Sequence, residues 1–143
     1  MRFLAIDPGD KRIGLAISDP TGTIANPLSV LKHISRAKNA TRIIEICKNY
    51  KVEKIIVGQS LDEDGIPTIQ GRKAARLAAA IQVISDIPVV LWDEYASTKI
   101  AKNAQIIIKS GKKKRKGHID EIAATVILQS YLDAISPQNH DCV

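Results

Sequence analysis

Cysteine, histidine and aromatic residues are scarce in this chain of 143 residues. The two cysteines, Cys47 and Cys142, have no second Cys or His at the spacing of a zinc site, so we expect free thiols. The three histidines are scattered along the chain and give little support to a Ser-His-Asp triad. Aromatic residues make up 3% of the chain, too few for a surface that reads single strands by base stacking. We therefore expect Trp92 to lie in the core.

Long hydrophobic runs are also missing. No apolar stretch approaches the roughly 20 residues that a membrane span needs, and we expect no membrane contact. The first residues, MRFLAIDPG, reach an acid too early for a secretion signal, so we expect a cytoplasmic protein. There is no internal repeat or linker. The length suits one domain, predicted over residues 1–136, with a flexible tail at 137–143.

Positive charge is in excess, with 21 Lys and Arg against 15 acids and a net charge of +6. A basic surface attracts polyanions such as nucleic acids. Five cations stand side by side between Gly111 and Gly117: Lys112, Lys113, Lys114, Arg115 and Lys116. Such a run can be a solvated loop, but it directly precedes a helix that carries a candidate site acid. We therefore expect it to contact phosphates.

The hydrophobic pattern predicts an α/β fold. Strands are expected at 2–7, 12–19, 23–31, 54–58 and 87–94, and helices at 35–50, 69–84, 97–110 and 118–135. Ser35 is a candidate N-cap, and Asp19 is expected to close a turn after the second strand. Three consecutive strands followed by strand–helix units indicate a mixed sheet with helices on its faces. Functional groups in such sheets gather at the carboxyl ends of the parallel strands.

Acids follow two of these predicted strands. Asp7 ends the first strand, and Asp93 and Glu94 end the last. Asp120, near the start of the final helix, shares a helical face with Ala123 and Ala124, which must pack on the sheet. A carboxylate at such positions is costly to desolvate unless a cation meets it. The cation can be a structural partner or a metal ion, and the acids alone leave both explanations open. For a metal, hard cations such as Mg²⁺ or Mn²⁺ suit carboxylate ligands.

Four motifs in order resemble the YqgF family, also called RuvX, whose members are described as Holliday junction resolvases or pre-16S ribosomal RNA nucleases. They are AIDPGDKRIGLAISD, IIVGQSLDEDG, PVVLWDEYAST and KGHIDEIAATVILQSYL, and the resemblance extends from about Arg2 to Asp133. It implies an RNase H-like fold: a five-stranded mixed sheet, three antiparallel strands and then two parallel ones, flanked by helices.

The resemblance also implies Mg²⁺- or Mn²⁺-dependent cleavage of phosphodiester bonds, which leaves 5′-phosphate and 3′-hydroxyl ends. The family's metal-binding and catalytic acids fall on Asp7, Glu94 and Asp120. Lys11 and Arg12 of the KRIG motif, with the run at 112–116, are expected to bind the nucleic-acid backbone. The substrate is expected to be pre-16S ribosomal RNA in ribosome biogenesis or, alternatively, a branched DNA junction in recombination. A monomer would suit the first and a two-fold dimer the second.

Two departures from the family pattern keep another alternative open. Gln59-Ser60 stands where the family commonly has Leu-Pro, and Tyr95-Ala96 where it commonly has Arg-Leu. The absence of that Arg removes a phosphate contact or an ion-pair partner, so the chain could be a nucleic-acid-binding module without catalysis. The DPGDKRIG stretch also resembles the first phosphate loop of actin-like ATPases, but those clamp a nucleotide between two domains, and this chain has the length of one.

Overall fold

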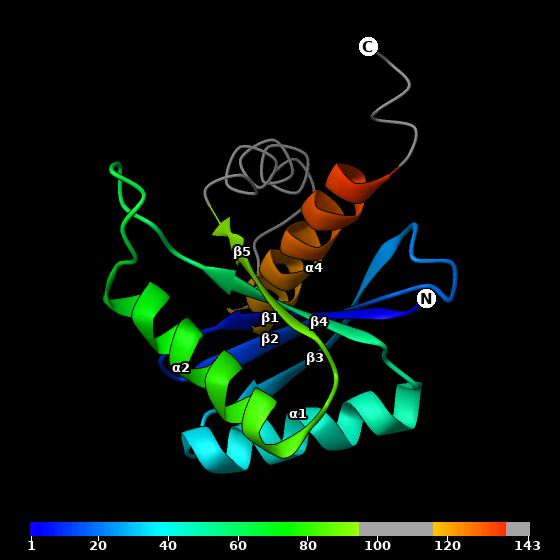
Figure 1. The fold of residues 1–143 in the computed structure, drawn as a ribbon, viewed down its shortest axis with the longest axis horizontal. Coiled ribbons are helices and arrows are strands. Elements are labelled where there is room, and N and C mark those ends of the chain that lie inside the picture. Colours follow the sequence, from blue (N-terminus) through cyan, green and yellow to red (C-terminus); the bar gives the residue numbers. More distant parts are fainter. Residues whose placement is uncertain (95–115, 137–143) are drawn as a thin grey trace.

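The computed structural model describes residues 1–94 and 116–136, apart from the side chains of residues 116–121. Within these residues five strands form one mixed sheet, in the order β3-β2-β1-β4-β5 (Figure 1). The strands are β1 (Phe3–Pro8), β2 (Arg12–Ser18), β3 (Ala25–Lys32), β4 (Lys54–Gln59) and β5 (Val89–Asp93). The helices are α1 (Arg36–Tyr50), α2 (Ile69–Ile84) and α4 (Lys116–Ile135). The helix predicted at 97–110 and the tail predicted at 137–143 lie outside the described residues.

The sheet has the predicted mixture of directions. The first three strands form an antiparallel meander, in which β1 pairs with β2 and β2 pairs with β3. The chain then adds β4 parallel to β1 and β5 parallel to β4. The continuously apolar stretch Ile55–Val57 is buried in β4, between β1 and β5, as expected for an interior parallel strand. The fold class predicted from the sequence is therefore confirmed.

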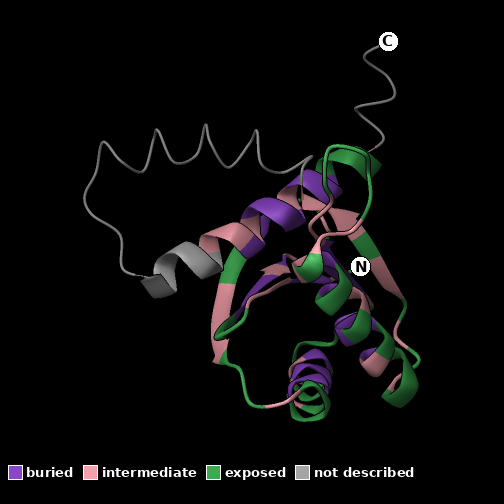
Figure 2. Cartoon of the chain, turned by 90° about the vertical axis from the view of Figure 1, so that its left-hand side faces the viewer, coloured by how far each residue is buried: buried purple, intermediate pink, exposed green. Residues whose placement is uncertain are grey.

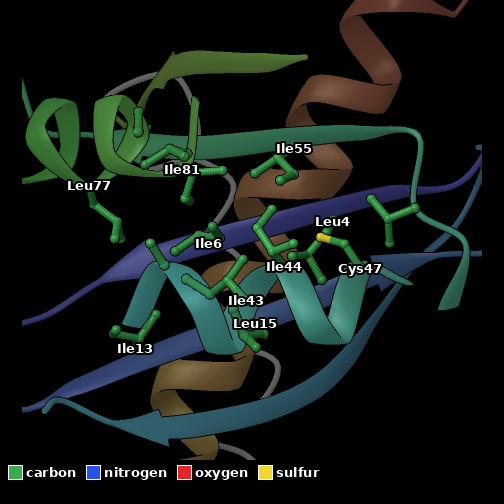
Figure 3. Packing of buried hydrophobic residues seen from close by; sticks show 14 of the residues in the cluster. Leu4, Ile6, Ile13, Leu15, Ile43, Ile44, Cys47, Ile55, Leu77 and Ile81 are labelled. Atoms are coloured by element: carbon green, nitrogen blue, oxygen red, sulfur yellow. The ribbon is translucent and has the colours of Figure 1, made fainter. Parts of the chain in front are cut away.

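One face of the sheet is covered by α1 and α2. Side chains of a strand alternate between its two faces, and Leu4 and Ile6 of β1 face these two helices. Figure 3 shows Ile43 and Cys47 of α1 directed toward the same strand residues. In Figure 2, α1 is seen nearly end-on, buried on one side and exposed on the other. Burial raises the pKa of the Cys47 thiol to about 12, because the thiolate would be poorly solvated there.

The opposite face of the sheet is covered by α4, which packs on Phe3 and Ala5 of β1. Trp92 of β5 belongs to this layer, as predicted. Its ring meets the ring of Tyr131 edge to face at 5.1 Å between centroids, and its Nε1–H donates to Ser130 Oγ at 3.1 Å. The partner satisfies the partly buried polar end of the indole, so Trp92 has a structural role. Within the described part of the chain, no helix is long and apolar enough to span a membrane.

The turn after β2 is organised by Asp19, as predicted. Its Oδ1 accepts hydrogen bonds from the backbone N–H groups of Thr23 and Ile24, at 2.8 and 2.9 Å, and the Thr21 hydroxyl donates to Oδ2. These bonds, that from Ile24 N–H having the largest effect, hold the pKa of the Asp19 carboxyl well below its usual range. Asp19 therefore serves a turn, and the candidate site must be built from other acids.

Candidate active site

The parallel strands β1, β4 and β5 end at the same edge of the sheet (Figure 1). Asp7 is the penultimate residue of β1, and Glu94 directly follows β5. Ile6 pairs with Val57, so Asp7 lies beside Gly58 of β4, and Gly58 in turn pairs with Trp92. Strand alternation puts Asp7 on the same face as Ala5, the face that α4 covers. Two of the three acids predicted for the site thus meet at one edge, around a glycine.

A cavity of about 220 Å³ opens at this edge, and we call it the acid pocket. Its lining residues are Asp7, Pro8, Gly58, Ser60, Gln70 and Glu94. A Cβ on Gly58 would lie 2.9 Å from Glu94 Oε1 and 2.7 Å from Ile127 Cδ1 of α4. Both distances are shorter than real Cβ atoms show, so the Glu94 carboxylate occupies space that only glycine leaves free.

Asp120 lies near the start of α4, which crosses the sheet from the side where these strands end (Figure 1). It precedes the buried Ala124 by four residues and Ile127 by seven, which is about two helical turns. The structure describes the backbone of Asp120 and not its side chain. Its part in the site therefore remains a prediction that depends on helical spacing.

The acid pocket has the donors that a hard divalent cation prefers. Asp7 and Glu94 contribute carboxylates, Ser60 a hydroxyl and Gln70 an amide oxygen. Among the residues whose side chains are described, no group of three or more His, Cys, Asp or Glu side chains forms a metal site. Two carboxylates fit Mg²⁺ or Mn²⁺, which keep several water and phosphate oxygens among their ligands.

Ser60 and Gln70 are pocket residues that the sequence did not indicate. The segment between β4 and α2 folds back on itself, because Thr68 N–H donates to the Ser60 carbonyl at 3.0 Å. Thr68 also caps α2, its Oγ1 accepting from Gly71 N–H at 3.1 Å. This fold brings the first turn of α2 to the end of β4. The available signals were the position of Ser60 directly after a parallel strand and the capping pattern that starts at Thr68.

The predicted backbone-binding residues are not in the acid pocket. Lys11 and Arg12, in the β1–β2 turn and at the start of β2, are exposed and line a separate open cavity of about 590 Å³ with Asp10 and His33. Lys112, Lys113, Lys114 and Arg115 lie outside the described residues, and Lys116 begins α4 with an undescribed side chain. Gly9 keeps the β1–β2 turn tight, because a Cβ there would be 2.5 Å from the Arg12 carbonyl oxygen.

Known proteins with the same fold include two resolvases of solved structure. RuvC of Thermus thermophilus, in complex with a Holliday junction substrate, superposes with a TM-score of 0.62 at 16% identity, covering 94% of this chain and 96% of RuvC. The Holliday junction resolvase of fowlpox virus superposes with a TM-score of 0.56 at 16% identity, covering 94% and 100%. These likenesses agree with the predicted RNase H-like fold.

Relatives in sequence are considerably closer. A protein of Syntrophus aciditrophicus is 41% identical over 140 residues, which is 96% of this chain and 92% of that protein. One of Caldanaerobacter subterraneus subsp. tengcongensis is 42% identical over 135 residues, or 94% and 97%. Both bear the name "Putative pre-16S rRNA nuclease". Residues 1–134 match the family model RuvX, described as Holliday junction resolvase. The chain belongs to the RuvX family.

Proposed function

We propose that this chain is a divalent-metal-dependent nuclease that hydrolyses phosphodiester bonds of structured RNA, with the precursor of 16S ribosomal RNA as its substrate. The observation that carries the proposal is the acid pocket, where Asp7 and Glu94 meet at the carboxyl ends of β1, β4 and β5. The choice of RNA is supported by the names of the relatives at about 40% identity.

Asp7, Glu94 and Asp120 would hold Mg²⁺ or Mn²⁺. When bound there, the metal would lower the pKa of a water molecule and offset the negative charge that develops on the phosphate. Asp7 stands on a strand hydrogen-bonded on both sides, by β2 and by β4, which fixes its backbone. Ser60 and Gln70 would donate hydrogen bonds to the substrate backbone. A rigid frame of this kind keeps the reacting groups aligned, which is the main contribution of a protein to phosphoryl transfer.

The overall reaction is hydrolysis. A water oxygen bonds to phosphorus, the bond between phosphorus and the 3′ oxygen breaks, and that oxygen takes up a proton. The products carry a 5′-phosphate and a 3′-hydroxyl. Lys11 and Arg12, exposed in and next to the β1–β2 turn, would hold phosphates beside the cleaved bond.

A second candidate substrate is a branched DNA junction. It is favoured by the description of the matching family and by the fold shared with RuvC. Cutting two strands of a junction symmetrically requires two copies of the site, so this activity predicts a two-fold dimer in solution.

The decisive experiment compares cleavage of end-labelled pre-16S RNA and a four-way DNA junction in Mn²⁺, Mg²⁺ or EDTA. The isosteric variant Asp7→Asn should lose cleavage and keep its fold by circular dichroism. The matched control is Asp86→Asn, an exposed acid in the connection before β5 and outside the acid pocket. It should cut like wild type.

Each result has a definite meaning. Metal-dependent cutting that disappears only in Asp7→Asn supports the nuclease, and the preferred substrate decides between RNA and DNA. Binding without cutting in either metal contradicts it and favours a binding module, in which Tyr95-Ala96 marks the loss of catalysis. Those two residues lie outside the described part of the chain.

A further inference from the structure

A third cavity lies on the other side of the end of β1, and we call it the cation pocket. Its volume is about 270 Å³, and it opens between the β1–β2 turn, the start of α1 and the first half of α2. Arg36 of α1 and Lys73 and Arg76 of α2 line it, with His33 from the segment before α1 and Asp10 from the turn. None of the three strong cations was among the residues predicted from the sequence to bind nucleic acid.

We propose that the cation pocket binds a backbone phosphate of the nucleic-acid strand whose neighbouring phosphodiester occupies the acid pocket. The inference rests on the proposed function for the identity of the substrate, and on the geometry of this chain for the site. In this arrangement the β1–β2 turn lies between two bound phosphates, and the start of α2 borders both of them.

The two pockets are contiguous. Pro8 lines both of them. Along α2, Gln70 lines the acid pocket and Lys73 lines the cation pocket. Gln70 and Lys73 are one helical turn apart, so the two pockets adjoin along the start of α2. A strand whose phosphodiester enters the acid pocket would therefore have its next phosphates beside the cation pocket.

The charge of the cation pocket suits a phosphate. Among the described residues that line it, the one acid is Asp10, whose Oδ1 is paired with Lys73 Nζ at 2.9 Å. Across residues 1–94 and 122–136, the Arg36 and Arg76 side chains form no hydrogen bond or ion pair with another group. Two guanidinium groups are thus left to meet an anion, and the planar guanidinium binds phosphate oxygens in pairs.

His33 is held so that it adds a hydrogen-bond donor. Asn39 is 2% exposed, and its Oδ1 accepts from Ile34 N–H at 3.2 Å and from Arg42 Nη1 at 3.3 Å. These two donors fix the orientation of the amide, so Nδ2 is the atom that faces His33 Nδ1 at 2.9 Å. His33 Nδ1 must accept this bond. The ring proton of the neutral imidazole is therefore on Nε2, which can donate to a phosphate oxygen.

The test is the affinity of a fluorescein-labelled RNA hairpin and of a labelled DNA junction, measured by anisotropy in EDTA at several salt concentrations. The variant Arg36→Gln with Arg76→Gln removes the two guanidinium groups of the cation pocket. The matched control, Lys38→Gln with Arg72→Gln, removes two exposed cations from the same two helices, neither of which lines the pocket. Glutamine keeps the helix propensity, and thermal unfolding checks the fold of both variants.

The pocket variant should bind at least about tenfold more weakly than the control, because it cannot form the hydrogen bonds between guanidinium and phosphate. The slope of log affinity against log salt should fall by about 0.7 to 0.9 for each phosphate that the protein no longer neutralises. Equal weakening in both variants, or none in either, would overturn the proposal. EDTA prevents cutting, so the result is independent of the nuclease. If the wild-type protein cuts neither substrate but the pocket variant still binds more weakly than the control, the proposed nuclease activity is refuted and the phosphate-binding role of the cation pocket is supported.

Discussion

Gly58 is the residue that sets the space around Glu94. Replacing it by alanine would add a methyl group 2.9 Å from Glu94 Oε1 and 2.7 Å from Ile127 Cδ1. The carboxylate can move toward solvent more easily than Ile127 can leave the core, so we expect Gly58→Ala to displace Glu94. Metal-dependent cleavage should fall at least about tenfold, because small misplacements of a reacting group have large effects on rate. The free energy of unfolding should fall by about 1–3 kcal/mol, measured in urea.

The control separates stability from activity. Gly65, in the turn between β4 and α2, has a φ of +79° and no atom within 4 Å of a built Cβ. Gly65→Ala should lower stability by about 1 kcal/mol through backbone strain alone. It should leave cleavage unchanged at temperatures where both variants are folded. If Gly58→Ala cuts as fast as Gly65→Ala, Glu94 does not depend on Gly58.

At the scale of elements, the sequence predicted closely those strands and helices that lie in the described residues, which leaves out the helix expected at 97–110. The predicted bounds of α2 match those observed, and the β1, β2, β4 and β5 bounds differ by one or two residues at most. The spacing of apolar residues, the helix caps and the turn residues are local signals, so these elements could be predicted from the sequence directly. The way the segment after β4 folds back toward that strand could not be predicted in this way. It depends on the bond between Thr68 N–H and the Ser60 carbonyl, which joins residues eight positions apart. Gln70 was missed in the site for this reason.

Thr68 connects α2 to the acid pocket, so we expect its replacement to affect both the stability of the protein and the binding of substrate. Its Oγ1 accepts from Gly71 N–H at 3.1 Å and donates to the Ser60 carbonyl at 3.3 Å. Thr68→Val keeps the shape and removes both bonds, so stability should fall by about 1 kcal/mol, the usual effect of removing an N-cap. The KM for RNA should rise modestly, because Ser60 and α2 would lose the hydroxyl bond and keep only the backbone bond from Thr68 N–H. Thr68→Ser keeps the hydroxyl and should restore both. Urea unfolding and steady-state cleavage provide the two readouts, and a variant with unchanged KM would contradict the link.

At the scale of the whole molecule, the sequence indicated the acids better than the cations. Asp7 lies at the end of β1 and Glu94 directly follows β5, and because both strands run parallel to β4 between them, strand direction alone brings the two acids to one edge. The cation pocket collects Arg36, Lys73 and Arg76 from two helices that cover the same face of the sheet. Their juxtaposition depends on how α1 packs against α2, which no local pattern records. A run of neighbouring cations is easy to see in a sequence, whereas a pocket assembled from separated ones is not.

The run at Lys112–Lys116 supplies five of the cations behind the net charge of +6, so replacing all five with serine would lower that charge to +1. If the run binds the substrate backbone, the salt dependence of RNA binding should become less steep by about 0.7 to 0.9 for each phosphate that the run had neutralised. The weakening should be equal for different RNA sequences, because phosphates carry no sequence information. A variant with the four lysines changed to Arg and Arg115 changed to Lys keeps the charge and should keep the slope. If the salt dependence of binding is unchanged in the serine variant, the run does not contact phosphates. Binding of the nucleic-acid backbone would then depend on the β1–β2 turn and the cation pocket.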